Sequence, residues 1–321
     1  MPEQAFSSYV LGLDTSNYTT SAALYDCRAN RVLHQKKLLP VKPGEVGLRQ
    51  SDAVFHHVRQ LWQVMEELCG DAQAPLAPAA VGASVRPRDQ EGSYMPCFLV
   101  GESFGRSLAQ LGGVPFYSFS HQAGHVAAAL YSVGRPDLFE RRFLAFHLSG
   151  GTTECLLVEP GGEKTPLAIT KLAGSLDLKA GQAIDRVGVA MGLPFPAGPA
   201  MEELAQNCPR TFSVRPVMKG MDCCLSGIEN QCKARLERGE SRQEVAKFCL
   251  SSIGAALEQM TSLALEKAGE LPVVYAGGVM CNRLIRSRIQ GRFSSALFAQ
   301  PQFSADNAAG IAVLTARRLE R

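Results

Sequence analysis

The feature that most constrains the fold is a pattern of strand, polar turn and strand that occurs twice in the chain. The first copy spans residues 9–25 and has a hydroxyl-rich turn, TSNYTT, at 15–20. The second copy spans residues 143–159 and has the turn SGGTT at 149–153. Short apolar runs on both sides of a polar turn are typical of strands that return on themselves. The sequence therefore predicts two separate hairpins.

Helical patterns lie between and after these strands. Apolar residues recur every three or four positions after Ser51 and after Ser241, which is the spacing of one helix face. Ser241 and Glu244 also form the pattern of a helix capping box. A further helix is expected at 93–111 and a strand at 273–276. Alternating strands and helices predict an α/β fold. The length of 321 residues predicts two domains, since a domain usually contains ~100–200 residues.

Composition and charge exclude several classes of protein. The chain is 46% apolar and 20% charged, as is typical of a globular protein. Its 33 basic and 30 acidic residues leave a net charge of +3, so we expect no DNA binding. We also expect no membrane segment, because no stretch reaches the ~18 unbroken apolar residues of a span. The start lacks the pattern of a signal peptide, so we expect a cytoplasmic protein.

Ten cysteines are dispersed along the chain. In a chain of this size without a secretion signal, we expect them to be reduced thiols. No C-x-x-C pair occurs among them, which argues against a zinc ribbon.

Two histidines are candidate metal ligands. His121 and His125 stand four residues apart in front of a helix-forming run. Positions i and i+4 lie on the same face of a helix, so both imidazoles can reach one ion. The alternative is a pair of helix-face histidines without a ligand. Gln122 stands where H-E-x-x-H metalloproteases carry their general base, which disfavours peptide hydrolysis.

Three turns are candidates for binding a nucleotide. The turns at 15–20 and 149–153 offer backbone N–H groups and hydroxyls without bulky side chains. The third is Gly277-Gly278, where a strand leads into a helix that starts near Asn282 and directs free N–H groups at an anion. A tight turn without a ligand is the alternative in each case. Neither G-x-G-x-x-G nor a P-loop occurs, so the sequence supports neither of those two nucleotide sites.

Several longer motifs occur along the chain in an order that is specific to one protein family. The motifs are VLGLDTS (10–16), SHQAGH (120–125), HLSGGTTE (147–154), KAGQAIDRVGVAMGLPFPAGPAMEELA (179–205), LSGIE (225–229), YAGGVMCNRLIRSRI (275–289) and FSADNAAGIAV (303–313). Their order resembles the TsaD family, the tRNA threonylcarbamoyladenosine synthases, within the actin-like ATPase superfamily. The resemblance covers nearly the whole chain.

This resemblance implies two RNase-H-like α/β domains around a central cleft. The first would consist of residues 1–118 together with a C-terminal helix at 306–321. The second would consist of residues 119–305 and would carry both the metal site and the nucleotide site.

The resemblance also implies particular binding residues. The metal of the family, iron or zinc, falls on His121, His125 and Asp306, and His147 stands where some members have a tyrosine ligand. Imidazole binds either metal, so His147 is expected as a fourth ligand. The nucleotide contacts, for ATP or for the adenylate threonylcarbamoyl-AMP, fall on Ser149, Gly150, Gly151, Gly198 and Asn282, with Asp185 on the ribose hydroxyls. Otherwise Asp185 would be a solvated carboxylate on a helix.

The implied activity is transfer of a threonylcarbamoyl group to the adenosine beside the tRNA anticodon, with partner subunits of the TsaD type. Candidate tRNA contacts are Arg283, Arg286, Arg288 and Arg292, and at the end of the chain Arg317, Arg318 and Arg321. Solvated helix faces are the alternative reading of these arginines.

Three departures from the family pattern point to a divergent paralogue. Tyr18 and Thr19 replace two adjacent acids implicated in transfer, so that turn lacks a general base and no catalytic residue is assigned. Arg86 and Arg88 stand in place of a glycine-rich loop and offer a clamp for carboxylate or phosphate. The stretch 176–185 lacks two further acids. Two alternatives follow: a metal- and nucleotide-binding regulatory or partner subunit, or a carbamoyltransferase with another acceptor, as in hydrogenase maturation.

Overall fold

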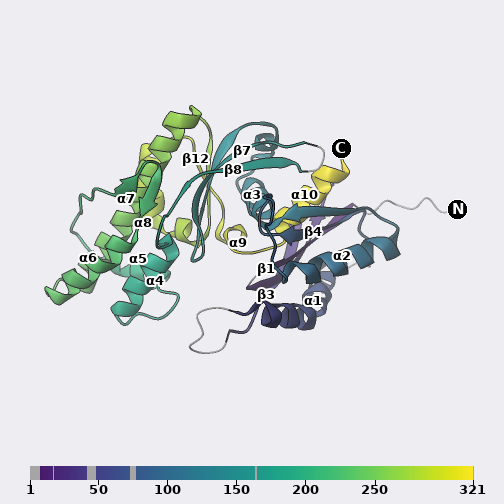
Figure 1. Ribbon diagram of the computed structural model, residues 1–321, viewed down its shortest axis with the longest axis horizontal. Coiled ribbons are helices and arrows are strands. Elements are labelled where there is room, and N and C mark those ends of the chain that lie inside the picture. The colour runs from purple at the N-terminus through teal and green to yellow at the C-terminus, as the bar shows by residue number, and fades with distance from the viewer. Residues whose placement is uncertain (1–7, 17, 42–47, 73–76, 163–164, 321) are drawn as a thin grey trace. The chain divides into compact units, whose positions relative to one another are not determined.

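The chain forms two compact units in a computed structural model that describes residues 8–16, 18–41, 48–72, 77–162 and 165–320 (Figure 1). Unit 1 contains residues 1–136, 161–167 and 306–321, and unit 2 contains residues 137–160 and 168–305. The boundary differs from the one expected after residue 118, because the helix that carries His121 and His125 packs against the C-terminal helix inside unit 1.

Unit 1 is built on a five-stranded mixed sheet. Its strands are β1 (Tyr9–Ser16), β2 (Thr19–Asp26), β3 (Arg31–Leu38), β4 (Val81–Arg86) and β5 (Phe116–Ser120). They are ordered β3-β2-β1-β4-β5, with β1 antiparallel to β2 and parallel to β4. Successive side chains of β1 therefore point to opposite faces of this sheet.

Helices cover both faces of the unit 1 sheet. Leu11 and Leu13 of β1 are buried in one cluster with Leu61, Val64 and Leu68, which all belong to one helix. On the opposite face, a Cβ atom on Gly12 would lie 2.4 Å from the backbone nitrogen of Ala312, in another helix. The helices of this unit are α1 (Gln50–Ala72), α2 (Phe98–Gly112), α3 (His121–Ser132) and α10 (Ala309–Leu319).

Unit 2 repeats the strand order of unit 1. Its strands are β6 (Phe143–Leu148), β7 (Thr153–Pro160), β8 (Leu167–Gly174), β11 (Val273–Ala276) and β12 (Ala296–Phe298). They are ordered β12-β11-β6-β7-β8, with β6 antiparallel to β7 and parallel to β11. In both sheets the first strand is therefore central, its hairpin partner lies on one side and the later parallel strands lie on the other.

The helices of unit 2 enclose a large apolar core. They are α4 (Ala180–Ala190), α5 (Gly198–Gln206), α6 (Ser226–Glu237), α7 (Arg242–Ala268), α8 (Arg283–Arg292) and the short α9 (Pro301–Ser304); β9 (Val217–Lys219) and β10 (Asp222–Cys224) form a small separate sheet. The capping box expected at the start of α7 is present. Among the described helices α7 is the one long and apolar enough to compare with a membrane span, but 67% of that stretch is buried inside the protein. It is a core helix of unit 2.

Candidate metal centre and nucleotide-binding turns

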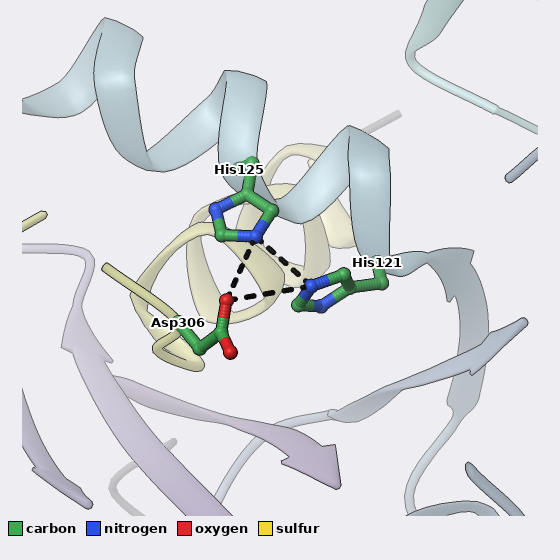
Figure 2. Close-up of side chains that lie close together, drawn as sticks. All are labelled: His121, His125 and Asp306. Atoms are coloured by element: carbon green, nitrogen blue, oxygen red, sulfur yellow. Dashed lines mark hydrogen bonds and ion pairs between the residues drawn. The ribbon is translucent and has the colours of Figure 1, made fainter. Parts of the chain in front are cut away.

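The two candidate metal-binding histidines project from the start of α3 (Figure 2). The hydroxyl of Ser120 caps this helix by accepting a hydrogen bond from the Ala123 N–H at 3.2 Å. Both imidazoles lie on one face of α3, as their i, i+4 spacing predicts, and the two Nε2 atoms of His121 and His125 lie 2.9 Å apart. Asp306, which stands three residues before α10 begins, points its carboxylate at both rings.

These three side chains fit one metal ion. Asp306 Oδ1 lies 3.2 Å from His125 Nε2 and 3.7 Å from His121 Nε2. Two atoms bound at ~2.1 Å to one tetrahedral ion lie roughly 3.4 Å apart, and the three separations of 2.9, 3.2 and 3.7 Å lie on both sides of this value. Two imidazoles and a carboxylate are a suitable donor set for zinc or iron. Three protein ligands leave a coordination position for water or substrate, as catalytic zinc sites do.

Asp14, which the sequence analysis did not identify as a site residue, supports this cluster. Its Oδ2 accepts a hydrogen bond from His121 Nδ1 at 2.6 Å. Burial lowers the pKa of His121, but the charge and hydrogen bond of Asp14 and the charge of Asp306 outweigh this effect and raise the pKa to about 9. An acidic residue at the end of the apolar strand LGLD is the signal that could have identified it.

His147 lies in the other unit, on the central strand β6, beside Glu154 of β7 and Ala276 of β11. In the described part of the chain, the group whose ligand atoms lie close enough to hold one metal ion consists of His121, His125 and Asp306. The role of His147 as a fourth ligand stays a prediction.

The SGG turn in unit 2 is held in shape by hydrogen bonds of its own. The hydroxyl of Ser149 accepts from the N–H groups of Gly151 at 3.3 Å and Thr152 at 3.1 Å. A Cβ atom on Gly150 or on Gly151 would meet nothing within 4 Å, so the space beside both glycines is open. This open backbone is suited to a phosphate group.

The N-terminus of α4 lies directly against this turn. The Gly181 N–H donates to the carbonyl of Ser149 at 3.2 Å, and the Ala180 N–H donates to the Thr153 hydroxyl at 2.9 Å. A Cβ atom on Gly181 would lie 2.7 Å from the backbone nitrogen of Gly150, so a side chain there would push the turn away. Gly181 is a second site residue that the sequence analysis did not single out. The positive end of the α4 dipole thus adds to the attraction for an anion.

Asp185 connects α4 to the turn before α5. One carboxylate oxygen accepts from the Ala197 N–H at 2.8 Å, which positions Gly198 at the start of α5. Burial raises the pKa of Asp185, and the bond from Ala197 opposes this shift. Space is open beside Gly198. The ribose contact of Asp185 and the nucleotide contact of Gly198 stay predictions.

The double-glycine turn lies next to the SGG turn. Gly277 has a φ of +100°, and a Cβ atom there would lie 2.1 Å from the carbonyl oxygen of Leu148, so only glycine fits. Asn282 is 6% exposed, and its Oδ1 caps α8 by accepting from the N–H groups of Leu284 and Ile285. The oxygen of Asn282 therefore has a structural role, and its nucleotide contact stays a prediction.

The turn between β1 and β2 is shorter than the hydroxyl-rich turn that the sequence predicts at 15–20. Most of its residues extend β1 and β2, which leaves only positions 17 and 18 between the strands. The Thr15 hydroxyl donates to the Cys97 carbonyl and accepts from the Gly101 N–H, while the Thr20 hydroxyl contacts His57 and Gln60. These threonine hydroxyls hold helices against the sheet, and Thr15 and Thr20 lie in strands instead of a turn. Phosphate binding by this stretch stays a prediction.

Arg86 has an internal partner. Its guanidinium forms two hydrogen bonds with Asp89 Oδ1, at 2.6 and 3.0 Å, and Asp89 Oδ2 accepts from the Ser120 hydroxyl at 2.7 Å. The loop after β4 is thereby tied to the cap of α3. Arg86 thus stabilises the loop. Its contacts with Asp89 do not support the anion clamp that the sequence predicts for Arg86 and Arg88.

Several of the arginines considered for tRNA contact have partners within the protein. Arg288 pairs with Glu258 at 2.6 Å, and the Arg286 guanidinium lies 4.7 Å from the ring centroid of Phe298. Arg321 lies outside the described residues. These contacts are typical of an ordinary helix surface.

The family model for TsaD, described as tRNA N6-adenosine threonylcarbamoyltransferase, matches residues 27–313. The chain belongs to the TsaD family.

Solved structures similar to this TsaD-family chain have the fold of the actin-like ATPase superfamily. HypF in its phosphate- and nucleotide-bound form is 12% identical with a TM-score of 0.60, over 99% of this chain and 47% of that chain. HypF of T. kodakarensis is 12% identical with a TM-score of 0.62, over 97% and 47%. Component A of (R)-2-hydroxyglutaryl-CoA dehydratase from Acidaminococcus fermentans is 15% identical with a TM-score of 0.57, over 98% and 100%. The chain thus spans about half the length of the HypF chains, and at these identities the likeness shows the fold alone.

Proposed function

We propose that this chain is a cytoplasmic, metal-dependent transferase that passes a threonylcarbamoyl group from threonylcarbamoyl-adenylate to the adenosine beside the tRNA anticodon. The observation that carries the proposal is the cluster of His121, His125 and Asp306, whose three ligand atoms already converge. Membership in the TsaD family supports the transferase class.

In this proposal His121, His125 and Asp306 hold iron or zinc. A bound ion of this kind supplies a Lewis acid that polarises the carbonyl of the carbamate. The turn at 149–151 and the N-terminus of α4 hold the phosphate of the adenylate, and Asp185 binds the ribose hydroxyls.

The proposed reaction is an acyl transfer in which no atom changes its oxidation state. The exocyclic amine of the adenosine forms a C–N bond to the carbamoyl carbon and loses a proton, and the bond from that carbon to the phosphate oxygen breaks so that AMP leaves. Partner subunits of the TsaD type are expected to supply the adenylate and to help position tRNA.

One feature favours a second candidate, a metal- and nucleotide-binding paralogue without tRNA transfer. Tyr18, which is 42% exposed, and Thr19, which is 3% exposed, occupy the hairpin end where TsaD proteins carry two acids. Neither residue is a general base at neutral pH. A carbamoyltransferase with a different acceptor remains the third candidate, and the likeness to HypF in fold is compatible with it.

The proposal is tested by metal analysis and by threonylcarbamoyl transfer to tRNA, reconstituted with TsaD-type partner proteins. We expect about one iron or zinc per chain, held by the cluster, and loss of metal and activity in His121→Ala. His56→Ala, on α1, is the matched control and should keep both. A native, folded protein that binds neither metal nor nucleotide contradicts the proposal.

If the protein binds metal but does not modify tRNA, the next question is whether the loss of the acids at Tyr18 and Thr19 abolished tRNA transfer. In that case Tyr18→Asp is tested first, because Thr19 is buried and Thr19→Glu would place a carboxylate in the core. A gain of tRNA modification indicates a decayed enzyme, and no gain indicates another acceptor or none.

A further inference from the structure

Asp14 is a buried carboxylate near the end of β1, and its side chain forms a hydrogen bond with His121. It is 1% exposed, and its Oδ2 lies 2.6 Å from His121 Nδ1. Its other oxygen, Oδ1, has no hydrogen-bond partner among the residues that the structure describes.

This burial is not explained by packing of the fold. A carboxylate removed from water costs several kcal/mol unless paired groups compensate. Even Asp89, an exposed carboxylate of the same unit, has partners for both oxygens, since Arg86 and Ser120 between them bond to both. Among the described residues, the imidazole of His121 is the one group that bonds to the Asp14 carboxylate, so this carboxylate is placed for that ring.

The hydrogen bond fixes which nitrogen of His121 is available to an ion. An ionised carboxylate can only accept, so Nδ1 must carry the hydrogen. The lone pair of a neutral ring is then on Nε2, and Nε2 is the atom that faces His125 Nε2 at 2.9 Å and Asp306 Oδ1 at 3.7 Å.

The backbone under Asp14 is held on several sides. β1 pairs with both β2 and β4, and the Ser21 hydroxyl donates to the Asp14 carbonyl at 3.1 Å. Gly12, two residues earlier on the same face, allows α10 to pack directly on the strand. The carboxylate therefore extends from a rigid sheet toward a ring on α3.

We propose that Asp14 is a positioning residue of the metal centre, which holds His121 in the orientation and tautomer that direct Nε2 at the ion. Carboxylate–histidine–metal arrangements of this kind raise metal affinity, and their loss typically weakens binding by about 10- to 100-fold. The inference rests on the metal site of the proposed function and adds to it a residue outside the ligand set.

The test measures zinc affinity of the full chain by competition with a chelator. Asp14→Asn keeps the shape of the side chain, but its NH₂ group can face Nδ1 and stabilise the tautomer with hydrogen on Nε2. We expect zinc affinity to fall by about 10- to 100-fold. Asp89→Asn is the matched control, because Asp89 contacts the cap of α3 and not the ring, and it should stay within about threefold of the native affinity.

Two further measurements separate positioning from a general loss of structure. Asp14→Glu keeps the carboxylate and should restore much of the affinity, and the visible spectrum of bound Co²⁺ should change in Asp14→Asn and return in Asp14→Glu. In the unmodified, zinc-loaded protein, imidazole ¹⁵N NMR should show the hydrogen of His121 on Nδ1. This last measurement does not depend on any variant folding.

Native zinc affinity in folded Asp14→Asn, equal losses in Asp14→Asn and Asp89→Asn, or a zinc-loaded His121 with hydrogen on Nε2 overturns the proposal. His121→Ala distinguishes this failure from failure of the metal site. If His121→Ala loses zinc while Asp14→Asn keeps it, the site stands and only the positioning role is wrong. If His121→Ala also keeps zinc, the metal site itself is wrong.

Discussion

A Cβ atom on Gly310 of α10 would lie 1.7 Å from the carbonyl oxygen of Gly124 in α3. The two helices therefore meet backbone to backbone, at a separation that only glycine permits. Gly124 stands next to His125, and Gly310 stands four residues after Asp306, so this crossing places the third ligand beside the two histidines.

We expect Gly310→Ala to destabilise unit 1 and weaken metal binding together. The added methyl group collides with backbone that has no rotamer to change, and overpacking of this kind costs about 1–3 kcal/mol or more. Thermal unfolding and zinc affinity measure the two effects. Gly70→Ala is the control, because its Cβ meets nothing within 4 Å, and it should leave zinc binding unchanged. Native metal affinity in Gly310→Ala would show that the crossing does not set the site.

Gly181→Ala should weaken nucleotide binding in unit 2. Its Cβ would lie within 2.8 Å of both the nitrogen and the Cα of Gly150, which forces the SGG turn away from α4. We expect the dissociation constant for ATP or AMP, measured by calorimetry, to rise about tenfold or more, since a misplaced anion site loses roughly 1.4 kcal/mol or more. Gly291→Ala, which meets nothing within 4 Å, should bind nucleotide normally. Equal binding by both variants argues against this turn as the phosphate site.

Asp177 should stabilise unit 2 in a pH-dependent way. Partial burial raises its pKa, but hydrogen bonds from Ser226, Leu225 and Leu178 outweigh this effect and hold the pKa below its usual value. A folded-state pKa below the unfolded value of ~3.9 stabilises the protein above that pH, and the contribution is lost as the pH falls through the folded-state value.

Asp177→Asn should therefore lower the melting temperature near neutral pH. We expect a loss of about 1 kcal/mol, because the carboxylate is exposed and solvent screens its hydrogen bonds. The difference between the two proteins should shrink as the pH is lowered into the acid range, and a difference that grows on acidification contradicts the assignment.

Three fully buried thiols, those of Cys97, Cys155 and Cys223, should resist modification in the folded protein. Burial raises the pKa of Cys97 and of Cys155 to about 12, and that of Cys223 to about 11, so their reactive thiolate forms are scarce at pH 8. A disulfide reagent followed by peptide mass analysis should label Cys27, which is exposed, before any of these three. Rapid labelling of Cys97 in the native state would contradict its burial.

Local patterns predicted the elements well where one signal dominated. The strands at 143–148 and 273–276 and the capped helix after Ser241 occur as expected. The helix expected from residue 93 begins at Phe98 instead, because Pro96 disfavours a helical conformation in the residue before it. The sequence did not predict the strands β3, β4, β8, β9, β10 and β12.

The sequence by itself determined which two candidate metal ligands share one face of a helix. The spacing of His121 and His125 places them together for any α3, since it depends only on the helical repeat. The position of Asp306 depended on tertiary structure, because it follows from the contact between Gly124 and Gly310. The same holds for Asp14: strand alternation places it on the face opposite Leu13, but only the packing of α3 brings His121 to it. Contacts between elements far apart in the chain depend on how backbones approach each other, which local sequence patterns do not specify.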